Sequence, residues 1–319
     1  MRKFTGYEPK GVIPACLLPF KTDLSIDEAP YRKHLRDVAT VPGITALTIN
    51  AHASEVASCT FEEQRRVLDI TVDEVGDDIP LVHGVYADGS LEAARIARMA
   101  DQGGASCLLV FPPSPFLLGG QSRPEMALTH FRRIADATDL PIIGFQYPLA
   151  GGQGYPLDTL LRMAEEIPTL RAIKDWCNDP VLADKQIKAL HALPRPVNVL
   201  STHSAWLFPS LVLGCDGLLS GSGSVIADLH VALWEAVQAD DLPKAREIHD
   251  RVMETVEVFY ASPVVDMHNR MKEALVILGR IPSAVVRPPL VKPSAQEIEK
   301  IRRALERAGI GRDGMAEAA

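Results

Sequence analysis

The stretch from Pro141 to Lys174, PIIGFQYPLAGGQGYPLDTLLRMAEEIPTLRAIK, contains the repeating unit from which the fold can be inferred. It opens with an almost unbroken apolar run to Tyr147 and then shows helical spacing of apolar residues from Pro156. A second apolar run begins at Leu170 and ends at Lys174. Continuous rather than alternating hydrophobicity is typical of strands buried on both faces of a parallel sheet. The stretch therefore predicts a strand, a helix and a second strand.

The same alternation extends in both directions along the chain. Helical patterns also begin after Thr60, which looks like a helix cap followed by early acids, and at Ser90. Eight β–α units within about 220 residues fit a closed (β/α)₈ barrel better than an open doubly wound sheet. No Gly-x-Gly-x-x-Gly opens a helix after the first strand, which weakens a dinucleotide-binding alternative. The eight expected strands are Gly11–Leu18, Ala46–Asn50, Pro80–Tyr86, Ser106–Phe111, Pro141–Tyr147, Leu170–Lys174, Val197–Ser201 and Gly217–Ser220.

The strand signal stops after Ser224. Residues 226–239, 242–260, 264–278 and 294–308 all have helical spacing without strands between them. We therefore expect an α/β fold in which residues 1–224 form a (β/α)₈ TIM barrel. Residues 225–319 would supply the eighth barrel helix and a C-terminal helical extension, with a frayed tail from Gly309.

Composition restricts the class of protein. The 319 residues are 47% hydrophobic and 23% charged, so a large core is expected. The net charge of −8 and the lack of a Lys/Arg-rich run argue against nucleic acid as a partner. No signal peptide is evident, and no apolar stretch approaches the roughly 20 residues that a membrane helix needs. The five cysteines are scattered without metal-ligand spacing. These features favour a cytoplasmic protein with reduced thiols and no membrane partner.

Chemistry in such a barrel is expected where the strands end. Lys174 is the most informative residue there, because a mainly apolar strand leads directly to it. Burial of an amine lowers its pKa and frees a nucleophile that can form an imine with a carbonyl compound. Position alone does not decide the matter, since a lysine at a strand end is more often a salt-bridge partner.

Six segments in chain order strengthen the hypothesis. They are Gly11–Phe20, Ala51–Glu55 with Thr60–Arg65, Ile142–Pro148, Ala172–Asp175, Gly214–Gly221 and Val286–Leu290. Together they resemble the dihydrodipicolinate synthase/N-acetylneuraminate lyase family of Schiff-base aldolases and dehydratases over nearly the whole chain. The resemblance implies a TIM barrel, a small 2-oxo acid as substrate, no cofactor, and Lys174 as the imine-forming residue. It also implies a homotetramer.

The departures from the family pattern are informative. The two family threonines correspond to His52 and Ala53, and the family tyrosine corresponds to Phe145, which has no hydroxyl. The arginine that binds a second carboxylate in lysine-pathway members would fall near Ala150 and is missing. Dihydrodipicolinate synthase activity is therefore not expected, and N-acetylneuraminate lyase, which also keeps the tyrosine, fits poorly.

Branches of the family that dehydrate 2-keto-3-deoxy sugar acids also lack the tyrosine, and their Ser-Glu pair is similar to Ser54-Glu55. This favours a sugar-acid dehydratase or a pyruvate-type aldolase. The acid/base is left open among Ser54, His52 and Tyr147, with Tyr86 as a further candidate; Tyr147 shares a strand face with Phe145. Glu55 is expected to be structural. The expected substrate-binding residues are Ala53, Ser54, Phe145, Gln146, Trp176, Ser220, Gly221 and Ser222.

Three alternatives differ in class. A metal-dependent aldolase is rejected because His83 and His203 have no third ligand at useful spacing. A non-catalytic 2-oxo-acid-binding protein would explain the loss of the threonine and tyrosine, but has no need for a desolvated lysine. A phosphosugar-binding barrel would use the Gly- and Ser-rich segment 220–224 as an anion site.

Overall fold

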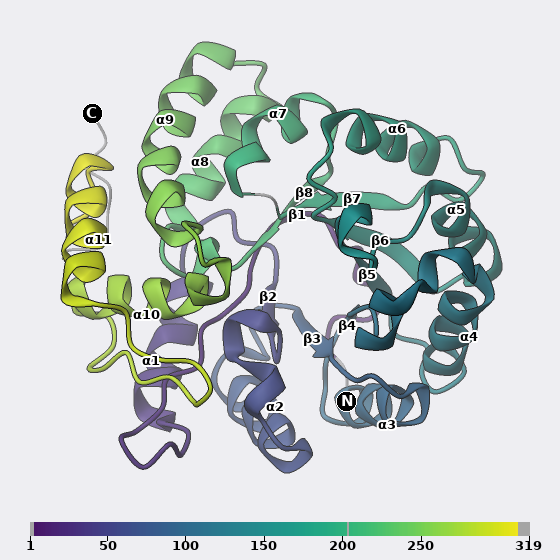
Figure 1. Cartoon of the computed structure of the whole chain (residues 1–319), viewed down its shortest axis with the longest axis horizontal. Coiled ribbons are helices and arrows are strands. Elements are labelled where there is room, and N and C mark those ends of the chain that lie inside the picture. The colour runs from purple at the N-terminus through teal and green to yellow at the C-terminus, as the bar shows by residue number, and fades with distance from the viewer. Residues whose placement is uncertain (1–2, 203, 312–319) are drawn as a thin grey trace.

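The computed structural model describes residues 3–202 and 204–311, and its central feature is an eight-stranded parallel sheet surrounded by helices (Figure 1). Hydrogen bonding gives the strand order β1-β8-β7-β6-β5-β4-β3-β2. Isolated parallel bridges Val12–Ile44 and Ala15–Thr48 join β1 to the β2 side and complete the ring. The predicted (β/α)₈ barrel is confirmed. The strands are β1 Gly11–Pro14, β2 Leu47–Ile49, β3 Leu81–Val85, β4 Cys107–Val110, β5 Ile142–Gln146, β6 Leu170–Asp175, β7 Asn198–Ser201 and β8 Gly217–Ser220.

Most strands are shorter than the apolar runs that predicted them. Leu17 and Leu18 are fully buried although β1 ends at Pro14. The runs continue into buried loops at the mouth of the barrel. An apolar run therefore predicted which residues are buried and not where strand pairing ends. There are two exceptions: β8 has the predicted bounds, and β6 extends one residue beyond Lys174 to Asp175.

Helices follow the strands in the order expected of the fold. Thr60 caps α2 with the reciprocal bonds of a capping box, in which Glu63 takes part. The predicted helix 264–278 is divided into a 3₁₀ turn, η8 (Val264–Asp266), and α10. The α-helices are α1 Glu28–Ala39, α2 Phe61–Val75, α3 Ser90–Gln102, α4 Pro124–Ala135, α5 Leu157–Glu166, α6 Pro180–His191, α7 Leu207–Val212, α8 Ala227–Gln238, α9 Leu242–Phe259, α10 Met267–Ile277 and α11 Ala295–Arg307.

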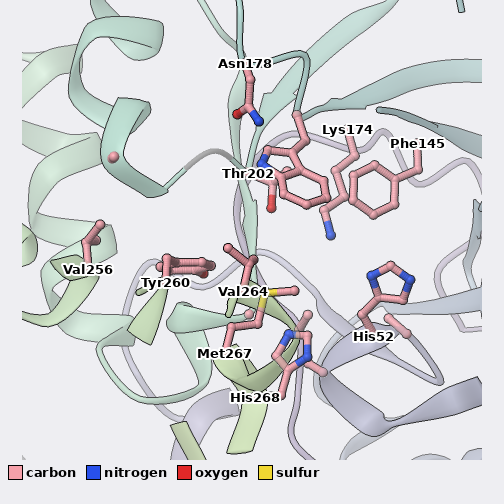
Figure 2. Close-up of a pocket in the computed structure, with 16 residues that line it drawn as sticks. His52, Phe145, Lys174, Asn178, Thr202, Val256, Tyr260, Val264, Met267 and His268 are labelled. Atoms are coloured by element: carbon pink, nitrogen blue, oxygen red, sulfur yellow. The ribbon is translucent and has the colours of Figure 1, made fainter. Parts of the chain in front are cut away.

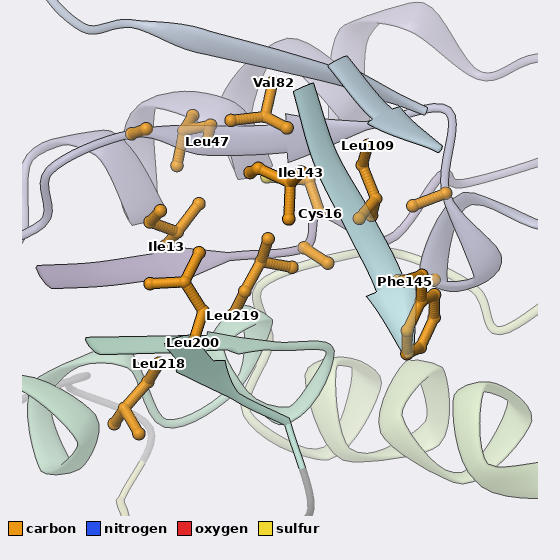
Figure 3. Packing of buried hydrophobic residues seen from close by; sticks show 14 of the residues in the cluster. Ile13, Cys16, Leu47, Val82, Leu109, Ile143, Phe145, Leu200, Leu218 and Leu219 are labelled. Carbon is orange, nitrogen blue, oxygen red and sulfur yellow. The ribbon is translucent and has the colours of Figure 1, made fainter. Parts of the chain in front are cut away.

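The inside of the barrel is filled by aliphatic side chains from different strands. Figure 3 shows Ile13, Leu47, Ile143 and Leu109 converging there, and all four are fully buried. A packed interior rather than a channel is the rule for this fold. Polar groups able to meet a ligand are consequently confined to the open end of the barrel.

The C-terminal helices cover part of that end. In the described residues, α9 packs on α8, and α10 and α11 pack on α9. Residues 312–319, most of the predicted tail, lie outside the described part of the chain. No helix in the described ranges is both long enough and apolar enough to span a membrane.

Candidate active site

A cavity of about 180 Å³ opens at the carboxyl ends of the strands. One wall comes from the strands and their loops, and the facing wall comes from the end of α9, η8 and the start of α10 (Figure 2). The strand-side wall includes Ala15, Ala51, His52, Ala53, Phe145, Lys174, Trp176, Asn178, Thr202, Ala205 and Gly221. The helical wall consists of Val256, Tyr260, Val264, Met267 and His268.

Lys174 points into this cavity from β6. It is 6% exposed, and its Nζ lies 4.1 Å from the centroid of the Phe145 ring. Phe145 is the register partner of Lys174 on the neighbouring strand β5. Burial lowers the pKa of the Lys174 ammonium to about 7. No residue in the ranges 3–202 and 204–311 gives this Nζ a hydrogen bond or an ion pair. A large fraction of the amine is therefore neutral and nucleophilic near neutral pH.

His52 lies on a tight turn after β2, in the 3₁₀ segment η1 (His52–Ser54). The turn packs closely on β3: a Cβ on Gly84 would lie 1.9 Å from the Asn50 carbonyl oxygen, so this approach requires glycine. The imidazole packs 4.7 Å from the Phe111 ring, centroid to centroid. Burial, and then the charge of Lys174, lowers the pKa of His52 to about 3. The ring is accordingly neutral at physiological pH.

Tyr147 contacts His52 through its hydroxyl. Its hydroxyl lies 3.1 Å from His52 Nε2, and its ring packs against Trp176 with centroids 5.7 Å apart. Burial raises the pKa of the Tyr147 phenol well above its ordinary value, so the hydroxyl keeps its proton. Tyr147 is not one of the described residues that line the cavity, and it therefore contacts a bound molecule only through His52.

Several predicted site residues use their polar groups inside the protein. The Ser54 hydroxyl donates to the Cys16 carbonyl at 2.9 Å, and the Ser54 N–H donates to the Ala51 carbonyl at 3.0 Å. Gln146 exchanges two hydrogen bonds of 2.8 Å with the backbone of Tyr155. These contacts fix loops around the cavity and direct the groups away from it.

The segment after β8 is similarly organised. Ser220 Oγ lies 3.0 Å from Ser222 Oγ and 3.5 Å from the Tyr260 hydroxyl, and Ser222 Oγ lies 3.3 Å from His230 Nε2. Of the three residues predicted here, Gly221 lines the cavity. The structure thus separates the predicted site residues into two groups. Those that line the cavity are Lys174, His52, Ala53, Phe145, Trp176 and Gly221. Those that lie outside its lining are Ser54, Gln146, Tyr147, Ser220 and Ser222.

The helical wall was missed by sequence reasoning. His268 is the residue with the clearest chemistry there, because Figure 2 shows its imidazole facing the same space as Lys174 and His52. A Cβ on Gly221 would lie 3.1 Å from His268 Nε2, so the glycine makes room for this ring. Burial, the main cause, holds the pKa of His268 well below its usual range. His268 is the second residue of α10 and falls inside the predicted helix 264–278, but helical spacing could not tell which part of the barrel it would meet.

A buried ion pair ties the His52 turn to the C-terminal segment. Glu55, in the left-handed conformation (φ 53°), accepts from Lys272 Nζ and from the Arg287 N–H at 2.9 Å. Arg287 in turn pairs with Glu63. Glu55 therefore has the structural role expected of it, although its partners come from a distant segment and not from its own loop.

No group of three or more His, Cys, Asp or Glu side chains suited to a metal ion occurs within residues 3–202 and 204–311. His83 is buried, and its Nε2 lies 2.8 Å from Asn50 Nδ2. His203 lies outside the described residues.

Comparison with known proteins identifies the relatives of this barrel. The pattern of the dihydrodipicolinate synthetase family matches residues 8–308. The chain belongs to this family. Its members are lyases, and the chain is a lyase of this family.

The similar proteins differ in what is known of them. A 4-hydroxy-tetrahydrodipicolinate synthase of Methanopyrus kandleri is 27% identical over 312 residues, covering 97% of this chain and 99% of the relative. An uncharacterised DapA-like lyase of Halobacterium salinarum is 34% identical over 247 residues, 76% of this chain and 77% of the relative.

Solved structures support the fold. A monomeric dihydrodipicolinate synthase variant superposes with a TM-score of 0.87 at 23% identity, over 95% of this chain and 97% of that one. YagE of Escherichia coli K12, solved in complex with pyruvate, superposes with a TM-score of 0.86 at 23% identity, over 94% and 99% of the two chains.

Proposed function

We propose that the protein is a Schiff-base lyase in which Lys174 forms an imine with a 2-oxo acid. The observation that carries the proposal is an amine buried at the end of β6, with a pKa lowered to about 7 and without an ion-pair partner among the described residues. Such an amine is a nucleophile at neutral pH, whereas an exposed lysine is almost entirely protonated.

The reaction begins when the neutral Lys174 amine attacks the keto carbon of the substrate. Loss of one water gives an iminium, which withdraws electrons from C3. In a dehydration, a C3 proton leaves to a base and the hydroxyl on C4 is expelled as water. In an aldol cleavage, a base takes the proton of the C4 hydroxyl, the C3–C4 bond breaks to release an aldehyde, and the enamine that remains takes a proton at C3 to become an imine again. Water then hydrolyses the remaining imine in either case.

We assign the proton transfers to His52 and the orientation of its ring to Tyr147. His52 lines the cavity and Tyr147 holds its Nε2 at 3.1 Å. The free enzyme keeps His52 neutral, but a substrate carboxylate brings negative charge beside it, and an opposite charge raises the pKa of an imidazole. Positioned proton transfer of this kind contributes typically about 10²–10⁴-fold to rate.

The cavity argues against 4-hydroxy-tetrahydrodipicolinate synthase activity in this chain. Phe145 supplies no hydroxyl, and Lys174 is the only charged side chain among the described residues that line the cavity. A substrate with a second carboxylate has no counter-charge there. We therefore propose a 2-keto-3-deoxy sugar acid dehydratase or a pyruvate-type aldolase.

The alternative of a non-catalytic 2-oxo-acid-binding protein is favoured by Phe145 and Ala53, which cannot transfer protons. The phosphosugar alternative has less support, because the Ser220 and Ser222 hydroxyls already contact each other and neighbouring groups.

Borohydride reduction in the presence of pyruvate tests the imine. Mass spectrometry of the wild type should show a pyruvate-sized adduct on the peptide that contains Lys174. Lys174→Arg should show none. Lys188→Arg, an exposed lysine paired with Asp184, should trap as the wild type does. Folded wild-type protein that traps neither pyruvate nor a 2-keto-3-deoxy sugar acid would refute the imine and leave the binding-protein alternative.

The homotetramer expected from the family resemblance stays a prediction, and a monomeric variant is found among the similar structures. Light scattering on the purified protein measures the assembly directly.

A further inference from the structure

The cavity lining is chemically mixed. Two imidazoles, those of His52 and His268, face the same space as the Lys174 amine (Figure 2). The helical wall adds the apolar side chains of Val256, Val264 and Met267, and the strand side adds the Trp176 ring. The amine and the imidazoles would meet the reacting atoms of the substrate, and the rest of the described lining is mainly apolar.

Apart from the amine and the two imidazoles, hydrogen-bonding side chains are few in the lining. Among the described residues they are Asn178, Thr202 and Tyr260, and no carboxylate or guanidinium lines any part of the cavity. The Tyr260 hydroxyl is already within 3.5 Å of Ser220 Oγ. A sugar acid would bring several hydroxyls against valine and methionine, and each one buried without a partner costs about 1–3 kcal/mol.

The apolar part of the lining combines fixed side chains with an adaptable one. Val256 is 4% exposed on α9, and Trp176 is held edge-to-face against Tyr147. Met267 begins α10 with an unbranched side chain that adapts to irregular contacts. An apolar group placed there gains about 25 cal/mol for each Å² that it removes from water.

We infer that the part of the substrate beyond C4 is an apolar group, aryl or branched alkyl, so that the enzyme interconverts 4-hydroxy-2-oxo acids of this type with pyruvate and an apolar aldehyde. The inference rests on the proposed function and chooses the aldolase over the sugar-acid dehydratase. In the cleavage direction the C3–C4 bond breaks, the C4 hydroxyl becomes the aldehyde carbonyl, and its proton is returned to C3 of the pyruvate enamine. The water lost on imine formation is regained on hydrolysis, so no other reactant is needed.

The test uses the synthetic direction with pyruvate and three aldehydes: 3-methylbutanal, benzaldehyde and glyceraldehyde. Product is measured by mass spectrometry, and kcat/KM is obtained for each aldehyde. The wild type should favour the two apolar aldehydes over glyceraldehyde by at least about tenfold, the equivalent of 1.4 kcal/mol.

Matched variants separate the cavity from intrinsic aldehyde reactivity. Met267→Gln keeps the side-chain length but adds an amide, and it should lower the ratio of kcat/KM for 3-methylbutanal to that for glyceraldehyde about tenfold. Met126→Gln makes the same change at a methionine on α4 outside the cavity, and it should leave the ratio unchanged. Val264→Thr in the cavity lining and Val265→Thr at a neighbour outside that lining form a second such pair, with a smaller change expected only in the first.

Borohydride trapping of pyruvate in every variant distinguishes the two ways of failing. Trapping on Lys174 together with a wild-type preference for glyceraldehyde, unaffected by Met267→Gln, would overturn the apolar site while leaving the Schiff-base lyase intact. Absence of trapping in the wild type would remove the proposed function itself, and this inference with it.

Discussion

Two lysines are buried in the described part of the chain, and they have opposite surroundings. Lys174 is 6% exposed and Lys272 is 0% exposed, and each ammonium nitrogen lies over a phenyl ring, 4.1 Å from the Phe145 centroid and 4.4 Å from the Phe20 centroid. Lys272 also pairs with Glu55 and donates to the Val285 carbonyl at 2.9 Å. Lys174 has no such partner among the described residues.

The difference shows that burial alone does not mark a catalytic lysine. Burial lowers the pKa of both amines, but at Lys272 the Glu55 carboxylate opposes the shift and occupies the ammonium. Lys272 therefore holds two segments together, while Lys174 keeps an amine that faces an open cavity. A missing counter-ion, more than low exposure, is the feature that indicates imine chemistry.

Replacing Lys174 should have the largest effect on turnover and little effect on stability. In Lys174→Met, kcat for the lyase reaction should fall by at least about 10³-fold, because the covalent intermediate cannot form. The free energy of unfolding should stay equal or rise, since no ion pair is lost and a desolvated amine is removed. A steady-state assay and urea denaturation measure the two. A variant that unfolds more readily while retaining turnover would reverse the roles given to the two lysines.

Replacing Lys272 should have the opposite pattern. Lys272→Met leaves Glu55 buried without its cation, and breaking a buried pair in this way costs about 3–5 kcal/mol of unfolding free energy. Urea denaturation measures the loss. The double variant Glu55→Gln/Lys272→Met should recover part of it, because the neutral amide can still accept from the Arg287 N–H. Equal stability of wild type and Lys272→Met would show that the pair holds nothing together.

The contrast also separates what the sequence could predict from what it could not. The barrel was predicted from eight apolar runs. The ends of three of these runs indicated that Lys174, His52, Phe145 and Trp176 would lie near the cavity. These residues were accessible to sequence reasoning because the carboxyl ends of parallel strands all meet at one end of the barrel. The direction of a side chain within a loop was not accessible, which is why Ser54 was expected in the site although its hydroxyl bonds to a buried carbonyl.

Contacts between segments far apart in the sequence could not be predicted. Lys272 and Glu55 are 217 residues apart in sequence, and nothing in either local pattern indicates the other. The helical wall that carries Tyr260 and His268 depends on how α9 and α10 pack over the barrel, which their amphipathic spacing does not specify. The position of the amine was therefore predicted more completely than the shape of the cavity.

Tyr147 tests whether the unpaired amine needs an organised neighbour. Tyr147→Phe removes the hydroxyl that orients His52 without changing the ring packing, so kcat should fall about 10–10²-fold with KM nearly unchanged. The pH profile of kcat should also shift, because the partner of the imidazole is lost. The yield of pyruvate trapped on Lys174 should match the wild type. A parallel loss of trapping and stability would make Tyr147 a packing residue only.

The last prediction concerns pH, and it distinguishes the two lysines by their titration. The folded protein gives Lys174 a pKa of about 7, against 10.5 for a lysine in water. Below pH 7 the neutral amine becomes scarcer by tenfold for each pH unit, so the initial rate of imine trapping should fall by that factor and reach a plateau above pH 7. Between pH 7 and 10.5 the unfolded chain holds a proton on this lysine that the folded protein has released.

The free energy of unfolding should therefore rise through this window by up to about 1.4 kcal/mol per pH unit from this residue, with no contribution to the slope below it. Subtracting the unfolding curve of Lys174→Met isolates the contribution, since that variant has nothing to titrate at this position. Lys272→Met provides the control, because it removes a buried lysine but leaves Lys174 and its slope in place. Parallel curves for wild type and Lys174→Met would mean that the Lys174 amine stays protonated in the folded protein. The missing ion-pair partner of Lys174 would then not make its amine a nucleophile at neutral pH.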